Sequence, residues 1–507
     1  MNSKPQRRFR WRRIAIVVLG VLLLLAGAIV LRCSYAFRDR NPGYTITLDL
    51  DGAKAKAVPR PLQVGFGRVK INPDLSDPGR PIWLAGFNQH RAATRIHDDL
   101  WAIACVVDDG YRRLGIVALD AIGLFHDDVI AVRRRLATGL KLDYAIVCAT
   151  HNHSTPDLMG LWGPHYFRTG VDPRYREQVI AGAAKALGDA VGALQLARVA
   201  FHEVPTPTAG LVADTRKPEV YDPDLRVMHF TNPTNGATLG TLIGWANHPE
   251  TVWARNTEIT ADFCGYLREA LEKGVVQDGK LLAAGVGGTH VYVNGAIGGL
   301  ISTTPGITVR DPYLNQDFRQ PTHEKARAVG RQLASHILPR LLTNAPATEH
   351  APLSIRARTI EVPLENAGFL LAPVIGLLDR GHVRWNTLRT EVALVAFGDA
   401  SLACIPGEIY PEIVNGGIEK APGGDYAVEP VEVPPIRELM PGKIKFIFGL
   451  ANDEVGYLIP KSEWDRQPPY LYGAKRGVYG EINSVGPEAA GRIHAAMREL
   501  SRIPSPP

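Results

Sequence analysis

Two histidines stand one residue apart directly after an apolar run. The run Tyr144–Ala149 is apolar and partly β-branched, which is typical of a buried strand, and it leads through Thr150 into His151, Asn152 and His153. In extended backbone, side chains two residues apart point to the same face, so both imidazoles can reach one ion or substrate. Histidine is also the commonest metal ligand. The pattern indicates either a metal or substrate site, or a pair of hydrogen-bonded loop histidines.

Three further residues with ligand atoms follow apolar runs. His248 ends LGTLIGWANH, and the proline after it favours extended backbone at the histidine. Glu408 follows SLACIPG, where a carboxylate can join two histidines in a zinc site that keeps one position open for water. Tyr457 lies in the apolar segment FGLANDEVGYLIP, a context typical of core tyrosines. Each residue also has an ordinary structural interpretation, so the prediction of a site depends on their convergence.

Several common functional classes lack their motifs in this chain. The glycine-rich stretch 285–299 does not have the G-x-G-x-x-G spacing of a dinucleotide site. The chain contains neither a G-K-[ST] phosphate loop nor the G-x-S-x-G elbow of an α/β-hydrolase. The five cysteines show no C-x-x-C spacing, so we expect no disulfide framework.

The N-terminus predicts a membrane anchor. Residues 1–13 form a basic tail with six Lys and Arg and no acid, and residues 14–31 are uncharged and almost wholly apolar, enough helix to cross a bilayer core. The tail accounts for the whole net charge of +6, so the basic composition does not indicate nucleic-acid binding. A basic flank stays cytoplasmic, which predicts a single-pass signal-anchor with the rest of the chain extracytoplasmic, periplasmic or extracellular. A cleaved signal peptide is the alternative.

Residues 32–60 are predicted to be a tether, and residues 61–507 one large α/β domain of mixed sheets with packed helices. We expect helices at 126–140, 175–191, 262–274 with Asp262 as N-cap, 324–342 and 487–500. Expected strands are 144–149, 239–246 and a hairpin of 391–397 and 401–405, with a further one at 44–50. Residues 421–442 are rich in Pro, Gly and acids and are predicted to form a long surface loop.

Taken in order, the motifs resemble the catalytic domain of the neutral/alkaline (non-lysosomal) ceramidases over roughly residues 62–490. The matching segments are I-H-D-D-L-W-A at 96–102, T-H-N-H-S-T-P at 150–156, A-N-H-P at 246–249, A-D-F-C-G-Y at 261–266, P-G-E-I at 406–409 and G-L-A-N through Tyr457 at 449–457. Members of this family typically carry a C-terminal immunoglobulin-like domain, which we expect to be absent here because the sequence stops at Pro507.

The resemblance implies a Zn²⁺ site and its surroundings. The implied zinc ligands are His151, His248, Glu408 and Tyr457. The resemblance places His153 beside the metal, as ligand support or as hydrogen-bond partner to the reacting group. It places Arg216 near the substrate oxygen and makes Tyr479 the second active-site tyrosine, with Tyr470 as its rival. Arginine and tyrosine would then stabilise a tetrahedral oxyanion.

One departure from the family pattern changes the expected chemistry. The position of the family's serine nucleophile holds Gly298, within the segment GAIGG. We therefore expect a zinc-activated water to be the nucleophile, in an amidohydrolase that cleaves an amide bond, with an N-acyl lipid such as ceramide as a possible substrate. The alternatives are a zinc esterase or lactonase of the same fold and a non-catalytic relative that binds a lipid or ligand. We predict membrane attachment through the N-terminal helix, and no nucleic-acid or protein partner.

Overall fold

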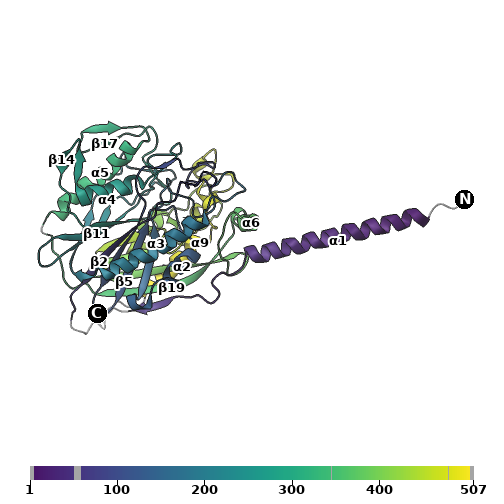
Figure 1. The fold of residues 1–507 in the computed structure, drawn as a ribbon, viewed down its shortest axis with the longest axis horizontal. Coiled ribbons are helices and arrows are strands. Elements are labelled where there is room, and N and C mark those ends of the chain that lie inside the picture. Colours follow the sequence, from purple (N-terminus) through teal and green to yellow (C-terminus); the bar gives the residue numbers. More distant parts are fainter. Residues whose placement is uncertain (1–4, 51–58, 344, 478, 503–507) are drawn as a thin grey trace.

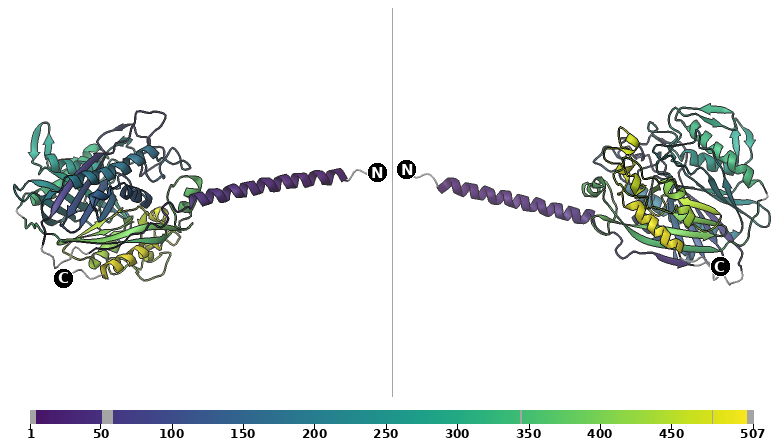
Figure 2. Two further views of the ribbon diagram at one scale, coloured as in Figure 1. Left: turned by 60° about the horizontal axis from the view of Figure 1, so that its bottom comes forward. Right: turned by 180° about the vertical axis from the view of Figure 1, so that it is seen from behind.

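Two strand-rich layers lie at the centre of the molecule (Figure 2). A first sheet of order β6-β5-β4-β2-β7 and a second of order β15-β11-β10-β8 both pack on a third of order β1-β19-β20-β21-β23. The computed structural model describes residues 5–50, 59–343, 345–477 and 479–502. Within these ranges the chain has a mixed α/β fold, as the sequence predicts.

The strand bounds follow sheet by sheet. The first sheet comprises β2 (Gln63–Lys70), β4 (Trp101–Asp108), β5 (Arg113–Leu119), β6 (Tyr144–Ala149) and β7 (Gln195–Leu196). The second comprises β8 (Arg198–Val204), β10 (Leu225–Thr231), β11 (Thr238–Trp245) and β15 (Thr289–Asn294). The third comprises β1 (Thr47–Leu50), β19 (Leu353–Pro363), β20 (Thr387–Phe397), β21 (Ala400–Cys404) and β23 (Ile444–Phe448).

Short strand pairs and helices complete the fold. The pairs are β3 (Arg95–Ile96) with β12 (Glu258–Ile259), β9 (Val212–Asp214) with β16 (Leu300–Ser302), β13 (Val275–Gln277) with β14 (Lys280–Ala283), β17 (Val309–Asp311) with β18 (Gln316–Phe318), and β22 (Glu408–Ile409) with β24 (Tyr457–Leu458). The helices are α1 (Pro5–Ala36), α2 (His126–Arg134), α3 (Pro173–Gly192), α4 (Asp262–Lys273), α5 (His323–Leu341), α6 (Ala367–Ile375), α7 (Pro411–Asn415), α8 (Ile436–Leu439) and α9 (Ala489–Arg502).

Continuous apolar runs in the first sheet arise because both of its faces are buried. Along β4, Ala102, Ala104 and Val106 face α3, whereas Ile103 and Cys105 on the opposite face pack toward the third sheet. Side chains alternate between the faces of a strand, so a strand covered on both sides has no polar positions. The outer face of the third sheet is covered by α9. The hydrophobic core therefore has three layers: one between α3 and the first sheet, one between the first and third sheets, and one between the third sheet and α9.

A close contact between α3 and β2 depends on glycine. A Cβ atom at Gly65 would lie 2.0 Å from the carbonyl oxygen of Ala190, and one at Gly67 would lie 2.1 Å from that of Ala186. Such distances are far inside van der Waals contact, so only glycine lets the helix backbone approach the strand. This packing fixes α3 over the sheet that carries the first histidine motif.

Three local predictions differ from the structure. The helix expected over 126–140 ends at Arg134, and a separate 3₁₀ turn covers Thr138–Leu140. Asp262 is not the N-cap of α4: Ala261 holds that position, and Asp262 begins the helix with φ 51° while its carboxylate accepts from the amide of Phe263. The 421–442 segment contains α8 and is partly buried, because Ile436 belongs to the core under α9.

The helix α1 projects away from the layered body (Figure 1). Its stretch Trp11–Ala36 spans 26 residues, and its most apolar 18-residue window has a mean hydropathy of 3.2 and is not buried in the described structure. At 1.5 Å per residue this stretch is about 39 Å long, enough to cross a bilayer core of about 30 Å. Residues 1–4 of the predicted basic tail lie outside the described residues.

Part of the stretch predicted as a tether is folded onto the domain. Strand β1 pairs antiparallel with β19 as the edge of the third sheet, and Asp39 forms an ion pair of 2.6 Å with Arg389 of β20. The helix α1 itself continues to Ala36. Residues 51–58 of the same stretch lie outside the described residues. The root of α1 is therefore connected to the body by paired backbone and by charge.

Candidate metal centre

The predicted histidines follow the carboxyl ends of two strands in different sheets. Strand β6 pairs in parallel with β5, and β11 pairs in parallel with β15. Strand β6 leads into His151, which adopts φ 63°, and β11 leads into His248. The amide of Asn294, at the end of β15, donates to the carbonyl oxygens of Thr150 and Asn247 at 2.8 and 2.9 Å. This side chain therefore holds the two strand ends, from different sheets, at one place.

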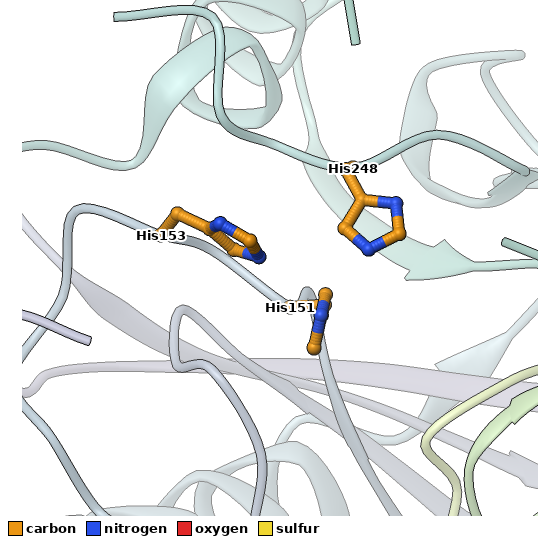
Figure 3. A group of neighbouring side chains, drawn as sticks. All are labelled: His151, His153 and His248. Carbon is orange, nitrogen blue, oxygen red and sulfur yellow. The ribbon is translucent and has the colours of Figure 1, made fainter. Parts of the chain in front are cut away.

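Three histidines converge there (Figure 3). One ring nitrogen each of His151, His153 and His248 lies within 4.8 Å of the others, and all three residues are buried. The ring centroids are 4.8 to 5.5 Å apart. The i and i+2 spacing thus brings both histidines of the first motif to the centre, and His153 is as well placed as His151 to offer a nitrogen.

Glu408 lies against the same group. Strands β22 and β24 pair in parallel with Glu408 opposite Tyr457, so both side chains lie on the same face. The carboxylate oxygen Oε2 of Glu408 is 3.0 Å from Nε2 of His248 and 3.4 Å from Nε2 of His151. Burial alone would lower the pKa of His151, but the charge and hydrogen bond of Glu408, together with the charge of Glu454 and the hydrogen bond to Ile122, raise that pKa to about 9.

The hydrogen bonds at the centre leave nitrogen atoms free for a cation. Nδ1 of His151 donates to the carbonyl oxygen of Ile122 at 2.7 Å, which turns Nε2 toward the centre. Nδ1 of His248 and Nε2 of His153 are buried without a hydrogen-bond partner among the described residues, whereas Nδ1 of His153 faces Oε2 of Glu250 at 3.2 Å. Burial lowers the pKa of His153 to about 4, so its ring is neutral near pH 7 and keeps a lone pair. Histidine nitrogens beside a carboxylate are the donor set that zinc prefers, so these residues fit the ion.

Tyr457 and Tyr479 meet beside this centre. Their hydroxyl oxygens are 2.6 Å apart, with Tyr457 buried and Tyr479 half-exposed. Burial and the charge of Glu408 raise the pKa of Tyr457, so in the absence of a cation the phenol keeps its proton. Tyr470, the alternative to Tyr479, does not line the pocket in the described part of the chain.

Arg216 lies outside the group of histidines and, in the described structure, does not line the same pocket. Its guanidinium donates to Glu481 at 2.8 Å and to the carbonyl oxygen of Glu463, and it stacks over the ring of Tyr410 at 5.1 Å. It borders a different surface hollow, which Asp465 also lines. Among the described residues, Arg216 therefore does not join the histidines, and Tyr479 is the predicted oxyanion partner that lies with them.

An apolar pocket of about 280 Å³ opens over the histidines. His151, His153, Glu408 and the two tyrosines are among the residues that line it. Most of its remaining wall is hydrocarbon, contributed by Phe87, Ile122, Phe125, Met159, Leu161, Trp162, Leu364, Phe369, Pro373, Leu378, Leu388, Val455 and Val485. Such a lining suits a ligand with a long apolar part and few polar groups.

Two carboxylates at the site were not singled out from the sequence. Oε2 of Glu250 lies 3.2 Å from Nδ1 of His153, and this buried contact orients the ring. Glu454 lines the pocket: its Oε1 accepts from the amide of Gly456 at 2.7 Å, and its Oε2 has no partner among the described residues. Burial and the charge of Glu408 raise the pKa of Glu454 well above its usual range. The available signal was proximity, because Glu250 follows His248 by two residues and Glu454 precedes Tyr457 by three.

The backbone at Gly298 excludes a side chain. A Cβ atom there would lie 2.4 Å from Cδ2 of Tyr410, 2.7 Å from the amide nitrogen of Tyr410 and 2.8 Å from the carbonyl oxygen of Glu408. Two of these three atoms are backbone and cannot rotate away. Glycine is therefore required at position 298 by packing against the segment that carries Glu408.

Gly298→Ser is expected to destabilise the protein by about 1–3 kcal/mol without adding hydrolytic activity, because the hydroxymethyl group overpacks a filled site. Chemical denaturation and turnover measure the two effects. Gly188→Ser is the matched control, since nothing lies within 4 Å of a Cβ at that position on α3. A Gly298→Ser protein of unchanged stability and raised turnover would mean that a serine nucleophile fits there after all.

The fold is similar to that of solved ceramidases. The neutral ceramidase from Pseudomonas aeruginosa matches with a TM-score of 0.64 and 16% identity over 87% of this chain and 74% of that chain. A ceramidase solved in complex with C2 matches with a TM-score of 0.62 and 16% identity over 87% and 75%. No family model matches the sequence. The chain therefore has a ceramidase-like fold, as the ordered motifs predicted, and a histidine-rich group that could hold a metal ion.

Proposed function

We propose that this chain is a membrane-anchored, zinc-dependent amidohydrolase that cleaves the amide bond of an N-acyl lipid such as ceramide. The observation that carries the proposal is the convergence of three buried histidines and Glu408 beside an apolar pocket, which His151, His153 and Glu408 line, in a ceramidase-like fold. The basic flank and apolar length of α1 support a single-pass anchor with the domain on the extracytoplasmic side.

Zinc is proposed to be held by His151, His248 and Glu408, with Tyr457 and His153 within the same group. When bound there, zinc polarises the acyl carbonyl and lowers the pKa of a water molecule. The residues of the chain provide the rest. Tyr479, hydrogen-bonded to Tyr457, borders the pocket and donates to the oxygen that becomes negative in the tetrahedral state.

Glu454 is proposed to carry the proton that the leaving amine needs. Its Oε2 has no partner among the described residues, and the side chain borders the pocket beside Glu408. A general acid must be within reach of the leaving nitrogen, and no other acid outside the proposed ligand set lines this pocket in the described structure. The hydrocarbon wall receives the acyl chain and excludes water from the reacting carbonyl.

The direct test compares two lipids with the same chains, one joined by an amide and one by an ester, using the zinc-loaded full-length protein in detergent. We expect hydrolysis of the amide, lost on chelation and restored by zinc. Cleavage of the ester alone would replace the proposal by an esterase or lactonase. No cleavage of either lipid by fully zinc-loaded protein would favour a non-catalytic lipid-binding protein.

A further inference from the structure

The helix α6 has an unusual surface for an exposed helix. Its nine residues, AGFLLAPVI, include no polar side chain, yet only Ala372 and Pro373 are buried. Leu371 is 56% exposed and Ile375 is 42% exposed. A helix on the surface of a soluble protein normally turns a polar face toward the solvent. An exposed apolar face therefore indicates a contact with a membrane or with another apolar surface.

The position of α6 relative to α1 indicates that the apolar contact is with a lipid bilayer. The guanidinium of Arg32, one residue beyond the apolar run of α1, donates to the carbonyl oxygen of Pro373 at 2.7 Å, and α6 lies beside the end of α1 that meets the body (Figure 1). The exposed Tyr35 follows, with the guanidinium of Arg38 3.7 Å from its ring centre. Arginine and tyrosine at the end of an apolar helix are typical of the membrane–water interface. A bilayer spanned by α1 would therefore have its surface at α6.

Two other segments that adjoin α6 expose apolar side chains. The loop bearing Tyr166 and Phe167 returns to Thr169, which shares a surface hollow with Arg32. Ile482 is exposed in the 3₁₀ turn Gly480–Asn483, and its carbonyl oxygen accepts from Asn366, the N-cap of α6. We call these exposed side chains the apolar rim; its members are Tyr166, Phe167, Leu371, Ile375 and Ile482.

The segments of the apolar rim also form the wall of the pocket. Phe369 and Pro373 of α6 line it, as do Leu161 and Trp162 at the start of the loop. Neither Leu371 nor Ile375 lines the pocket, so α6 turns one side inward and another outward.

We propose that the apolar rim enters the bilayer surface where α1 ends, so that a lipid can pass from that leaflet between the rim segments into the pocket. The membrane contact stands independently of the reaction, whereas the passage of a substrate lipid rests on the proposed function. We assign a bilayer as the contact partner of the apolar rim because the rim adjoins the root of α1, a helix that is long and apolar enough to span a bilayer.

The test places an environment-sensitive NBD fluorophore on Leu371→Cys in the full-length chain with Cys33→Ser, reconstituted in phosphatidylcholine vesicles. Leu281→Cys is the control, because Leu281 is also 56% exposed but lies on β14, far from α1 (Figure 1). We expect blue-shifted emission at 371 that is quenched by doxyl-labelled lipid, and water-like, unquenched emission at 281. Equal, water-like emission at both positions would overturn the membrane contact.

A second measurement separates this contact from the reaction. Burial of one leucine side chain changes a partition equilibrium about tenfold or more, so Leu371→Asp is expected to lower hydrolysis of a vesicle-embedded N-acyl lipid about tenfold. Hydrolysis of a water-soluble short-chain amide should be unchanged, and Leu281→Asp should affect neither. Equal loss on both substrates would contradict lipid entry over the rim. Absence of hydrolysis by the unmodified chain would count against the proposed function and leave the fluorescence result valid.

Discussion

His248→Ala is expected to abolish zinc binding and to lower turnover roughly a thousandfold, the scale on which loss of a central electrostatic group affects catalysis. His248 follows β11 of the second sheet, and its Nε2 lies 3.0 Å from Oε2 of Glu408, which lines the pocket. Removing its ring leaves the Glu408 carboxylate with one facing histidine instead of two, and takes one of the three proposed His/His/Glu ligands from the zinc site.

The matched control is His323→Ala. His323 is also a histidine that faces a carboxylate, with Nε2 3.1 Å from Oε2 of Glu258, and it belongs to a second group with His97 and Asp98 that could hold an ion. Bound zinc and turnover are measured together on each purified protein. His323→Ala should match the unmodified chain in both, whereas a His248→Ala protein with full zinc and full turnover would refute the assigned site.

Glu391→Gln is expected to reduce the free energy of unfolding by about 3–5 kcal/mol, because it leaves a buried guanidinium without its counter-charge. Arg133 of α2 makes two contacts with this carboxylate, of 2.7 and 2.9 Å, and Tyr144 at the start of β6 donates to it as well. Glu391 is fully buried on β20. The network therefore ties the strand that delivers His151 to the third sheet.

The control for this substitution is Glu361→Gln on the adjacent strand β19, whose ion pair with Arg384 is largely exposed, so a change of no more than about 1 kcal/mol is expected. Chemical denaturation of each protein gives the comparison. Burial alone would raise the pKa of Glu391, but Arg133 holds it below its usual value. A carboxyl with a depressed folded-state pKa stabilises above its unfolded pKa, so the difference between the two variants should persist at pH 7 and shrink only on acidification. Equal stabilities at pH 7 would contradict the role of the network.

Local signals in the sequence predicted the strands and the histidines at their ends. The run Tyr144–Ala149 forms β6 with the predicted bounds, and the glycine-containing hairpin joins β20 to β21. These strand predictions agree with the structure because a strand buried on both faces is rich in apolar residues. His151 and His248 follow such strands within three residues. The order of the motifs predicted the ceramidase-like fold that the comparison of structures supports.

Contacts between segments that are distant in the chain could not be predicted from local sequence patterns. The pairing of Glu408 with Tyr457 depends on a two-residue parallel bridge that has no pattern of its own. Arg216 turns away from the histidines because Glu481 and Tyr410 hold its guanidinium, and Glu454 matters because the fold buries its carboxyl beside the pocket. Asp262 has a residue type typical of an N-cap, but Ala261 holds that position, and the carboxylate of Asp262 accepts from the amide of Val252 at 3.3 Å.

Anomalous diffraction at the zinc edge from crystals of the zinc-loaded protein tests the metal centre most directly. The expected result is a peak about 2.0–2.3 Å from a nitrogen of His151, a nitrogen of His248 and an oxygen of Glu408. The same map reveals whether His153 and Tyr457 complete the coordination. A peak confined to the group of His97, Asp98 and His323, or no peak from crystals grown in excess zinc, would contradict a zinc-dependent reaction in this pocket.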